Sequence, residues 1–288
     1  MSVFKKNIFG EDLINKLKIF GINPNKKLGQ HFLTDESSIN ILTKSIKPDS
    51  TIIEIGSGPG QLTEALARKA KKVISIEIDL QYKPILSDVA SHYNNLHLIF
   101  ADALSINWQE LIKNKERVQI IASLPYHITE PFLHKVRKLP IYDITLVVGD
   151  TLNKAIQAID EKDSNFSQRS LLVHTFFHSK ILGTIDKQYF IPVPKTNSVI
   201  IKLIPKKENE IYANRHSFIF NQLFLSSTQG MLIKNCLRES FIRYSSEKIT
   251  RNQARNMINE MKIGIDTLNK SFDQLNNNEL RTLSRALR

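Results

Sequence analysis

Between residues 36 and 150 the hydrophobic pattern switches repeatedly between two periodicities. Short apolar runs rich in β-branched residues predict strands, and apolar positions spaced three and four residues apart predict helices. The expected strands are Thr51–Ile55, Val73–Ile78, Leu96–Phe100, Val118–Ala122 and Ile144–Val148. The expected helices are Glu36–Ile46, Leu62–Ala70, Leu80–Ala90, Trp108–Lys113 and Glu130–Lys138. This alternation favours an α/β fold with a parallel sheet that helices cover on both faces.

The pattern changes near residue 206, where the polar run PKKENE interrupts it. Beyond this run no strand is predicted and helical spacing takes over. The expected helices are Arg215–Ser227, Met231–Phe241, Ile249–Met261 and Asn278–Arg288. The sequence therefore predicts three parts: a basic N-terminal segment over residues 1–35, an α/β domain over residues 36–206 and a small all-α domain over residues 207–288.

The charge balance points to a polyanionic partner. Lys and Arg number 40 against 28 Asp and Glu, a net charge of +12, which favours nucleic acid or an anionic membrane as partner. No apolar run reaches the roughly 18 residues that a membrane span needs, and the N-terminus, with Glu11 and Asp12, is unlike a signal peptide. The single cysteine, Cys236, excludes an internal disulfide and a cysteine-based metal site. We therefore expect a cytoplasmic protein with neither a membrane nor a metal partner.

A glycine-rich turn, Gly56-Ser57-Gly58-Pro59-Gly60, joins the first predicted strand to the helix after it. Glycines there permit a tight turn and a close approach of backbone N–H groups to a ligand. A dinucleotide fingerprint would read G-x-G-x-x-G, whereas this turn reads G-x-G-x-G and Pro59 has no N–H to offer a phosphate. The turn therefore favours a ligand that has no pyrophosphate.

Two carboxylates extend this prediction. Glu77 follows the turn by about 20 residues, at the end of the second strand, where an acid accepts hydrogen bonds from ribose hydroxyls. Asp102 follows the third strand and can accept from the exocyclic amine of adenine. Each acid alone could be a solvated loop residue, but together with the turn they predict an adenosine site at the strand ends. An adenosine ligand without a pyrophosphate indicates S-adenosyl-L-methionine, and hence methyl transfer.

The fourth predicted strand ends in Ser123-Leu124-Pro125-Tyr126. The Ser123 side chain and the Leu124 carbonyl can accept from the exocyclic amine of a nucleobase and aim its lone pair at a sulfonium methyl group. Pro125 fixes the backbone, and Tyr126 can stack on a base that has left its helix. Such a reaction needs orientation more than a strong base. A simple strand-ending turn is the alternative interpretation of these four residues.

Together these motifs resemble the KsgA (RsmA) family of small-subunit rRNA adenine dimethyltransferases over nearly the whole chain. The similar segments are KLGQHFL (27–33), EIGSGPGQLT (54–63), IEID (76–79), Asp102-Ala103, SLPY (123–126) and FIPVPKTNS (190–198). The resemblance implies a Rossmann-like S-adenosylmethionine-dependent methyltransferase domain with a small C-terminal all-α domain. It also implies that the N-terminal segment packs on the cofactor site and that the helical domain contacts rRNA.

The resemblance assigns roles to individual residues. The implied cofactor-binding residues are His31, Leu33, Gly56, Ser57, Gly58, Glu77, Ile78, Asp102, Ala103 and Ser123. The implied catalytic edge is Ser123, Leu124, Pro125 and Tyr126. Tyr126 and Phe190 would stack on the target adenine.

The implied activity is dimethylation of two adjacent adenosines near the 3′ end of 16S rRNA in the small ribosomal subunit, during ribosome biogenesis, by a monomer. Ser123 stands where the family has asparagine, and VVGDTLNKAI lacks the family's Gln-x-Glu. Two alternatives remain open. One is a related methyltransferase of 23S rRNA in the large subunit, and the other is a weakly active ribosome-assembly or RNA-binding factor on the same fold.

Overall fold

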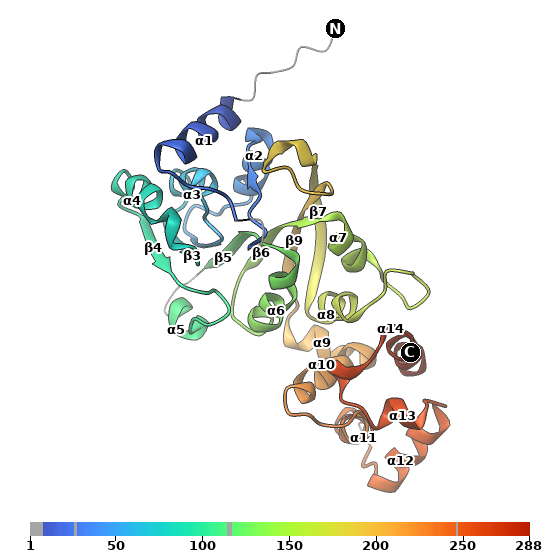
Figure 1. Cartoon of the computed structure of the whole chain (residues 1–288). Helices are drawn as coiled ribbons and strands as arrows, with labels where there is room; N and C mark the ends of the chain where they lie inside the picture. The colour runs from blue at the N-terminus through green and yellow to red at the C-terminus, as the bar shows by residue number, and fades with distance from the viewer. Residues whose placement is uncertain (1–7, 26–27, 114–116, 246) are drawn as a thin grey trace. The chain divides into compact units, whose positions relative to one another are not determined.

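The computed structural model describes residues 8–25, 28–113, 117–245 and 247–288. The chain forms two compact units. Figure 1 colours the chain by residue number from blue at the N-terminus to red at the C-terminus. The first unit takes the chain up to Asn153 together with Lys180–Ile204. The second unit takes Lys154–Ser179 together with Pro205–Arg288. The chain therefore passes between the units more than once.

A seven-stranded sheet forms the centre of the first unit, with the strand order β4-β3-β2-β5-β6-β9-β7. The strands are β2 (Thr51–Ile55), β3 (Lys72–Glu77), β4 (Leu96–Phe100), β5 (Val118–Ser123), β6 (Asp143–Gly149), β7 (Phe177–Ile185) and β9 (Ser198–Pro205). Strands β2 to β6 pair in parallel, as the sequence predicts. Strand β9 pairs antiparallel with β6, and neither β9 nor β7 was predicted. The sheet is therefore mixed, with a parallel core and an antiparallel extension.

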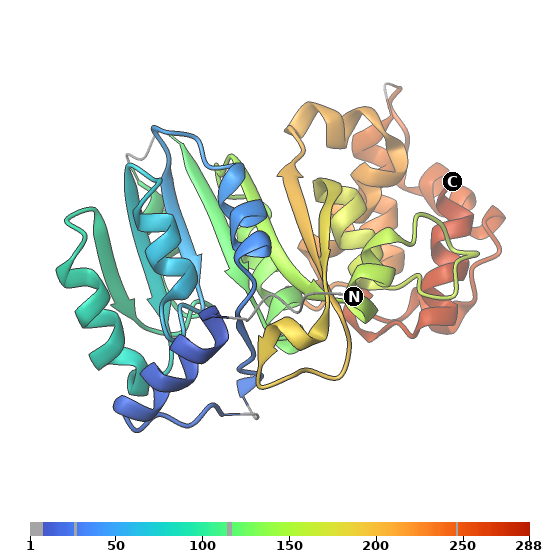
Figure 2. The ribbon, with the colours of Figure 1, turned by 90° about the horizontal axis from the view of Figure 1, so that it is seen from above.

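Helices cover the parallel part of the sheet on both faces, with α2, α3 and α4 on one face and α5 and α6 on the other (Figures 1 and 2). Their bounds are α2 Glu36–Lys44, α3 Gln61–Ala67, α4 Lys83–Ser91, α5 Trp108–Ile112, α6 Tyr126–Val136 and α7 Asp150–Gln157. A 3-10 turn, η2 (Leu80–Tyr82), precedes α4. The predicted start of α6 at Glu130 was wrong, because the helix begins four residues earlier, directly after Pro125.

The parallel strands are buried on both faces, so their sequences are almost continuously apolar. Ile52, Ile121 and Ile200, from three different strands, belong to one buried cluster. Glu54 breaks the apolar run in β2, although its side chain is fully buried. A buried carboxyl group in the middle of a central strand needs hydrogen-bond partners, which the site provides.

The N-terminal segment packs against the first unit at two places. Helix α1 (Ile8–Ile19) buries Leu13 and Leu17 against Ile85 and Leu86 of α4. Farther along, the short strand β1 (Phe32–Leu33) pairs antiparallel with β8 (Phe190–Ile191). Residues 28–34, which we call the N-terminal strap, therefore lie beside a segment that is more than 150 positions away in the sequence.

The second unit is mainly helical, as the sequence predicts for residues after 207. Its helices are α8 Gln168–Phe176, α9 Glu208–Ala213, α10 Arg215–Ser227, α11 Ile233–Tyr244, α12 Arg251–Glu260, α13 Ile265–Leu268 and α14 Asn277–Leu287. Residues 154–179, which the sequence placed in the α/β domain, belong to this unit instead. Helix α8 packs on α10 through Phe176 and Phe224, whose ring centroids are 5.7 Å apart. The sequence of residues 168–176 predicted neither this helix nor its partner, because its buried residues are nearly consecutive rather than spaced along one helical face.

Candidate active site

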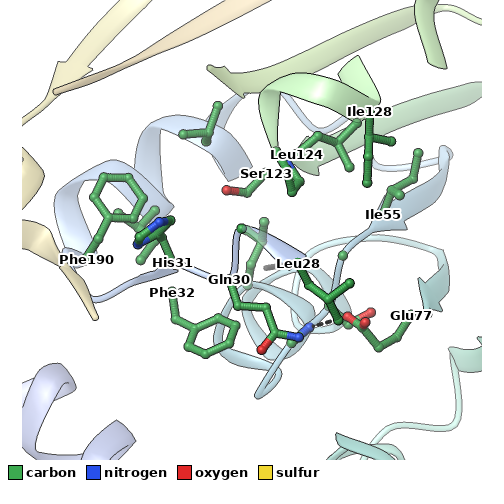
Figure 3. Close-up of a pocket in the computed structure, with 18 of the residues that line it drawn as sticks. Leu28, Gln30, His31, Phe32, Ile55, Glu77, Ser123, Leu124, Ile128 and Phe190 are labelled. Carbon is green, nitrogen blue, oxygen red and sulfur yellow. Dashed lines mark hydrogen bonds between the residues drawn. The ribbon is translucent and has the colours of Figure 1, made fainter. Parts of the chain in front are cut away.

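A cavity of about 580 Å³ lies within the first unit, at the carboxyl ends of the parallel strands and under the N-terminal strap (Figure 3). Ligands of α/β proteins bind at this edge of the sheet, and the volume suits a small organic molecule. The wall combines residues from the strap, the glycine-rich turn, the ends of β3, β4 and β5, and the segment around β8.

The glycine-rich turn requires glycine for two reasons. Gly56, Gly58 and Gly60 have φ angles of 78°, 51° and 91°, which side chains larger than hydrogen rarely tolerate. In addition, a Cβ atom at Gly58 would lie 2.7 Å from Cε1 of Phe32 in the strap. The turn is closed by a 3.0 Å hydrogen bond from Gly60 N–H to the Ser57 carbonyl. The sequence indicated the tight turn, and the structure adds the close contact with the strap.

Glu77 is buried, and backbone groups hold its carboxylate at both oxygens. Gly58 N–H donates to Oε2 at 2.8 Å, and Asp79 N–H donates to Oε1 at 2.8 Å. Burial raises the pKa of the Glu77 carboxyl above its ordinary value, while these N–H donors oppose the shift. Each oxygen keeps a lone pair, so the fixed carboxylate can still accept hydrogen bonds from a ligand.

Asp102 lines the cavity beyond the end of β4. Its Oδ1 accepts from Leu104 N–H at 2.8 Å, and its Oδ2 accepts from the Ser105 hydroxyl at 3.2 Å. The next residue, Ala103, holds the indole of Trp108 through a 2.8 Å hydrogen bond to its carbonyl. The acid is therefore held by its own loop and keeps acceptor positions for a ligand.

The end of β5 forms the part of the wall near Gly56. Ser123, Leu124 and Pro125 all line the cavity. The Ser123 carbonyl lies 3.5 Å from the position of a Cβ at Gly56, so the strand end and the glycine turn are adjacent. The ring of Pro125 packs on the strap so closely that a Cβ at Gly29 would lie 2.9 Å from it.

The strap and β8 form the side of the cavity where His31 and Phe190 lie near each other (Figure 3). His31 Nδ1 is 2.6 Å from the Pro192 carbonyl. A carbonyl oxygen only accepts hydrogen bonds, so this ring nitrogen carries the proton. Phe190 is almost fully buried and lines the same cavity. Its partner across the short sheet is Leu33.

The cavity brings the predicted residues together. The predicted cofactor-binding residues that line it are His31, Leu33, Gly56, Ser57, Gly58, Glu77, Ile78, Asp102, Ala103 and Ser123. Leu124, Pro125 and Phe190 line it as well. The side chain of Tyr126 and the motif residue Lys27 lie outside the described part of the chain. The roles of all these residues remain predictions.

Several residues of the wall were not singled out from the sequence. They are Leu28, Gln30, Gln61, Ile128, Thr151 and Lys195. Gln30 was visible within the motif KLGQHFL, but the motif alone gave no reason for a glutamine. Leu28, Gln61 and Lys195 also lie within quoted motif segments, but no role was assigned to them. Ile128 and Thr151 carry no local signal, because only the folded chain brings them to the cavity.

A buried hydrogen-bond network supports the glycine turn from below. Glu54 Oε2 accepts from the Thr63 and Ser75 hydroxyls, each at 2.6 Å. The Ser75 hydroxyl is also hydrogen-bonded to that of Ser57, which lines the cavity. Because Ser75 donates to Glu54, Ser57 must donate to Ser75, and the lone pairs of the Ser57 oxygen can accept from a ligand. Burial raises the pKa of the Glu54 carboxyl to about 7.

Two absences hold for the residues that the structure describes. Among them, no group of three or more His, Cys, Asp and Glu side chains could hold a metal ion. Within the same residues, no helix has both the length and the hydropathy that crossing a bilayer requires.

Cys236 is buried in α11, and burial raises the pKa of its thiol. A buried thiol with a raised pKa is typical of a packed cysteine rather than a reactive one.

The parallel strand order and the cavity at the strand ends define a class, the Rossmann-like methyltransferase domain, here with a helical second unit. Two solved structures share the fold. A dimethyladenosine transferase from Plasmodium falciparum is 22% identical with a TM-score of 0.57 and covers 88% of this chain and 97% of its own. The 23S rRNA methyltransferase ErmE is 22% identical with a TM-score of 0.55, and the match covers 89% of this chain and 99% of the ErmE chain.

The chain belongs to the family described as Ribosomal RNA adenine dimethylase, whose model matches residues 21–275. Ribosomal RNA small subunit methyltransferase A of Clostridium botulinum (strain Okra / Type B1) is 34% identical over 215 residues, which are 73% of this chain and 77% of the relative. The protein of the same name from Staphylococcus aureus (strain MRSA252) is 33% identical over 213 residues, 70% of each chain. The predicted family and fold class are confirmed.

Proposed function

We propose that this protein transfers methyl groups from S-adenosylmethionine to adenine N6 in 16S rRNA of the small ribosomal subunit, and that it dimethylates two adjacent adenosines. The observation that carries the proposal is the single cavity that joins the glycine turn, two strand-end acids and the Ser123–Pro125 edge. The names of the small-subunit relatives support the choice of rRNA. The proposal has the protein act as a monomer in the cytoplasm, where ribosomal subunits are assembled.

The residues present suit an adenosine cofactor. Glu77 offers a fixed carboxylate for ribose hydroxyls, and Asp102 offers one for the adenine amine. The buried network below the turn leaves an acceptor on Ser57. The turn contains Pro59 and so offers one N–H fewer to a phosphate than a dinucleotide site would. When bound, S-adenosylmethionine supplies the electrophilic methyl group.

The strand end and β8 would hold the target base. The Ser123 hydroxyl and the Leu124 carbonyl accept from the adenine amine and direct its lone pair into the cavity. Phe190 offers a buried aromatic ring on the same wall, and Tyr126 is proposed as its partner on the other face of the base. The chain supplies orientation and a dry surrounding, which together lower the barrier without a strong general base.

The helical unit offers exposed cations for the rRNA backbone. Arg251, Arg255 and Lys262 are exposed on or next to α12. By contrast, Arg281 of α14 hydrogen-bonds to backbone carbonyls of the 161–166 segment, and Arg288 pairs with Glu161. We therefore propose α12, more than α14, as the rRNA-contacting helix. Such contacts to phosphate weaken steeply with salt.

The proposal is tested by incubating the purified protein with labelled S-adenosylmethionine and small subunits from a strain that lacks this methylation. Label in adenine N6, mapped by mass spectrometry to adjacent nucleotides, is the expected result. Isolated large-subunit rRNA serves as the parallel substrate. Label only in the large-subunit rRNA would mean that the target is the large subunit and not the small one. No label in either substrate would overturn the proposed activity.

Ser123 favours a second candidate, a weakly active assembly factor on the same fold. A hydroxyl is shorter than the family's carboxamide and less fixed in direction, so it holds an amine less firmly. The candidate predicts that Ser123→Asn raises turnover strongly while small-subunit binding stays the same. Wild-type turnover equal to that of the Staphylococcus aureus relative, measured side by side, would exclude it.

A further inference from the structure

The side chain of Gln30 is hydrogen-bonded at both ends of its amide. Its Oε1 accepts from the Tyr82 hydroxyl at 2.8 Å and from Asn25 N–H at 2.6 Å. Its Nε2 donates to Asp79 Oδ2 at 2.7 Å. Figure 3 shows this side chain extending from the strap towards the Glu77 side of the cavity. Gln30 therefore connects the strap to the turn that follows β3.

The residues beside Gln30 touch the other walls of the cavity. Gly29 packs on Pro125, and Phe32 packs on Gly58 and on the Tyr82 ring, whose centroid is 5.6 Å away. His31 contacts the Pro192 carbonyl beside Phe190. The strap thus runs from the acid side of the cavity to the Phe190 side.

The two attachments of the strap differ in kind. At β8 the strap is held by backbone pairing, which most side chains would preserve. On the acid side it is held by the Gln30 amide, which donates and accepts at once. Asp79 is committed to this contact, because its carboxylate also accepts from Gln81 N–H at 3.1 Å and Gln81 Nε2 at 2.5 Å. Glu77 is left as the acid for a ligand.

We propose that Gln30 is a positioning residue that latches the strap to Asp79, and that the affinity for the amino-acid end of the cofactor depends on this latch. The inference rests on the proposed S-adenosylmethionine site. His31 of the strap lines the cavity on the side away from Glu77 (Figure 3). Leu33 lines the same cavity and pairs with Phe190. A ligand whose ribose binds Glu77 places its amino-acid end towards that side, under the strap.

The variant Gln30→Glu separates the latch from simple packing. It keeps the acceptor for Tyr82 and Asn25 but places a second carboxylate against Asp79, so the strap is repelled. Adding Asp79→Asn restores a donor–acceptor pair with the opposite polarity. Gln81→Glu is the matched control, because it brings the same charge to the same Asp79 oxygen from η2 without touching the strap.

The first measurement is calorimetric binding of S-adenosylhomocysteine and of 5′-methylthioadenosine, which lacks the amino-acid portion. Gln30→Glu is expected to lower the affinity for S-adenosylhomocysteine about 10-fold and the affinity for 5′-methylthioadenosine less than about 3-fold. The double variant is expected to recover most of the loss. An equal loss of affinity for both ligands in Gln30→Glu, or the same selective loss of affinity in Gln81→Glu, would overturn the inference.

The second measurement needs no cofactor. Hydrogen exchange of the peptide over residues 28–34 is expected to accelerate in Gln30→Glu, to recover in the double variant and to stay unchanged in Gln81→Glu. Unchanged exchange in Gln30→Glu would show that no latch exists. Failure of the wild type to bind either nucleoside would instead count against the proposed cofactor, so the two failures can be told apart.

Discussion

The two sides of the cavity are built in different ways. On the acid side, Glu77, Asp102 and the glycine turn lie at strand ends, and the acids are held by backbone N–H groups of nearby residues. On the other side, the wall joins the strap, the end of β5 and the segment around Phe190, which come from distant parts of the chain. The acid side is fixed by local geometry, and the other side depends on long-range contacts. We expect changes to the two acids or the glycine turn to act on all adenosine ligands, and changes to the strap, the end of β5 or the segment around Phe190 to act on the amino-acid end or on the target base.

The largest effect is expected from Gly58→Ala, because Gly58 is where the two sides meet. The positive φ and the clash with Phe32 should destabilise the fold by roughly 2–5 kcal/mol and reduce methyl transfer at least about 100-fold. Thermal unfolding and single-turnover rates measure both. Gly230→Ala is the control, because φ is 65° there and a Cβ would meet nothing within 4 Å. If both variants lose the same stability and the same methyl-transfer rate, backbone strain alone explains why glycine is required at position 58.

The next effect concerns Glu54, below the acid side. Its folded-state pKa of about 7 lies above the ordinary value of 4.5, so the folded protein holds an extra proton between these pH values. The free energy of unfolding should therefore fall as pH rises from about 5 to about 8, by on the order of 2–3 kcal/mol. Thr63 and Ser75 donate to this group and the charge of Glu77 acts on it. Denaturant unfolding of Glu54→Gln should lack this fall, and an identical fall in the variant would assign it to another group.

Glu77→Gln tests the acid side directly. The loss of a charged acceptor should weaken S-adenosylhomocysteine and 5′-methylthioadenosine equally, by about 30-fold in calorimetric titrations. This equal loss is the opposite of the pattern expected for Gln30→Glu. Glu64→Gln, at a half-buried α3 residue that pairs with Arg68 outside the cavity wall, should change neither affinity. If Glu77→Gln lowered the affinity for S-adenosylhomocysteine alone, the amino-acid end of the ligand, and not its ribose, would lie at Glu77.

The smallest effect is expected from Ser123→Ala, on the target side. Removing one neutral acceptor should lower kcat about 5-fold and leave cofactor affinity within about 2-fold. Ser123→Asn should change kcat in the opposite direction. Single-turnover methylation of small subunits measures both variants. Unchanged kcat in Ser123→Ala would leave the Leu124 carbonyl as the group that holds the amine.

The sequence was sufficient where structure is local. Strands β2 to β6 and helix α10 were predicted within a residue or two, because their apolar patterns fit one element type. The glycine turn, Glu77 and Asp102 could be placed at one edge because parallel strands end together. The element predictions needed only neighbours along the chain, and the shared edge followed from the general geometry of parallel sheets.

Long-range features could not be predicted in the same way. The apolar run in β9 was present, but nothing in it specified antiparallel pairing with β6. The hydrogen bond between Gln30 and Asp79 joins residues 49 positions apart, and the contact of His31 with Pro192 spans 161. The motif KLGQHFL contains the right residues, but their partners become known only after folding.

The division of the chain has an evolutionary consequence. The helical unit takes α8 from the middle of the sequence and α10 from the end, and Phe176 packs on Phe224 within it. A recombination event at residue 206 would carry away α10 and leave Phe176 of α8 without the ring of Phe224. Because the helical unit is built from two separate stretches of the chain, a single cut at one position does not remove or exchange it whole.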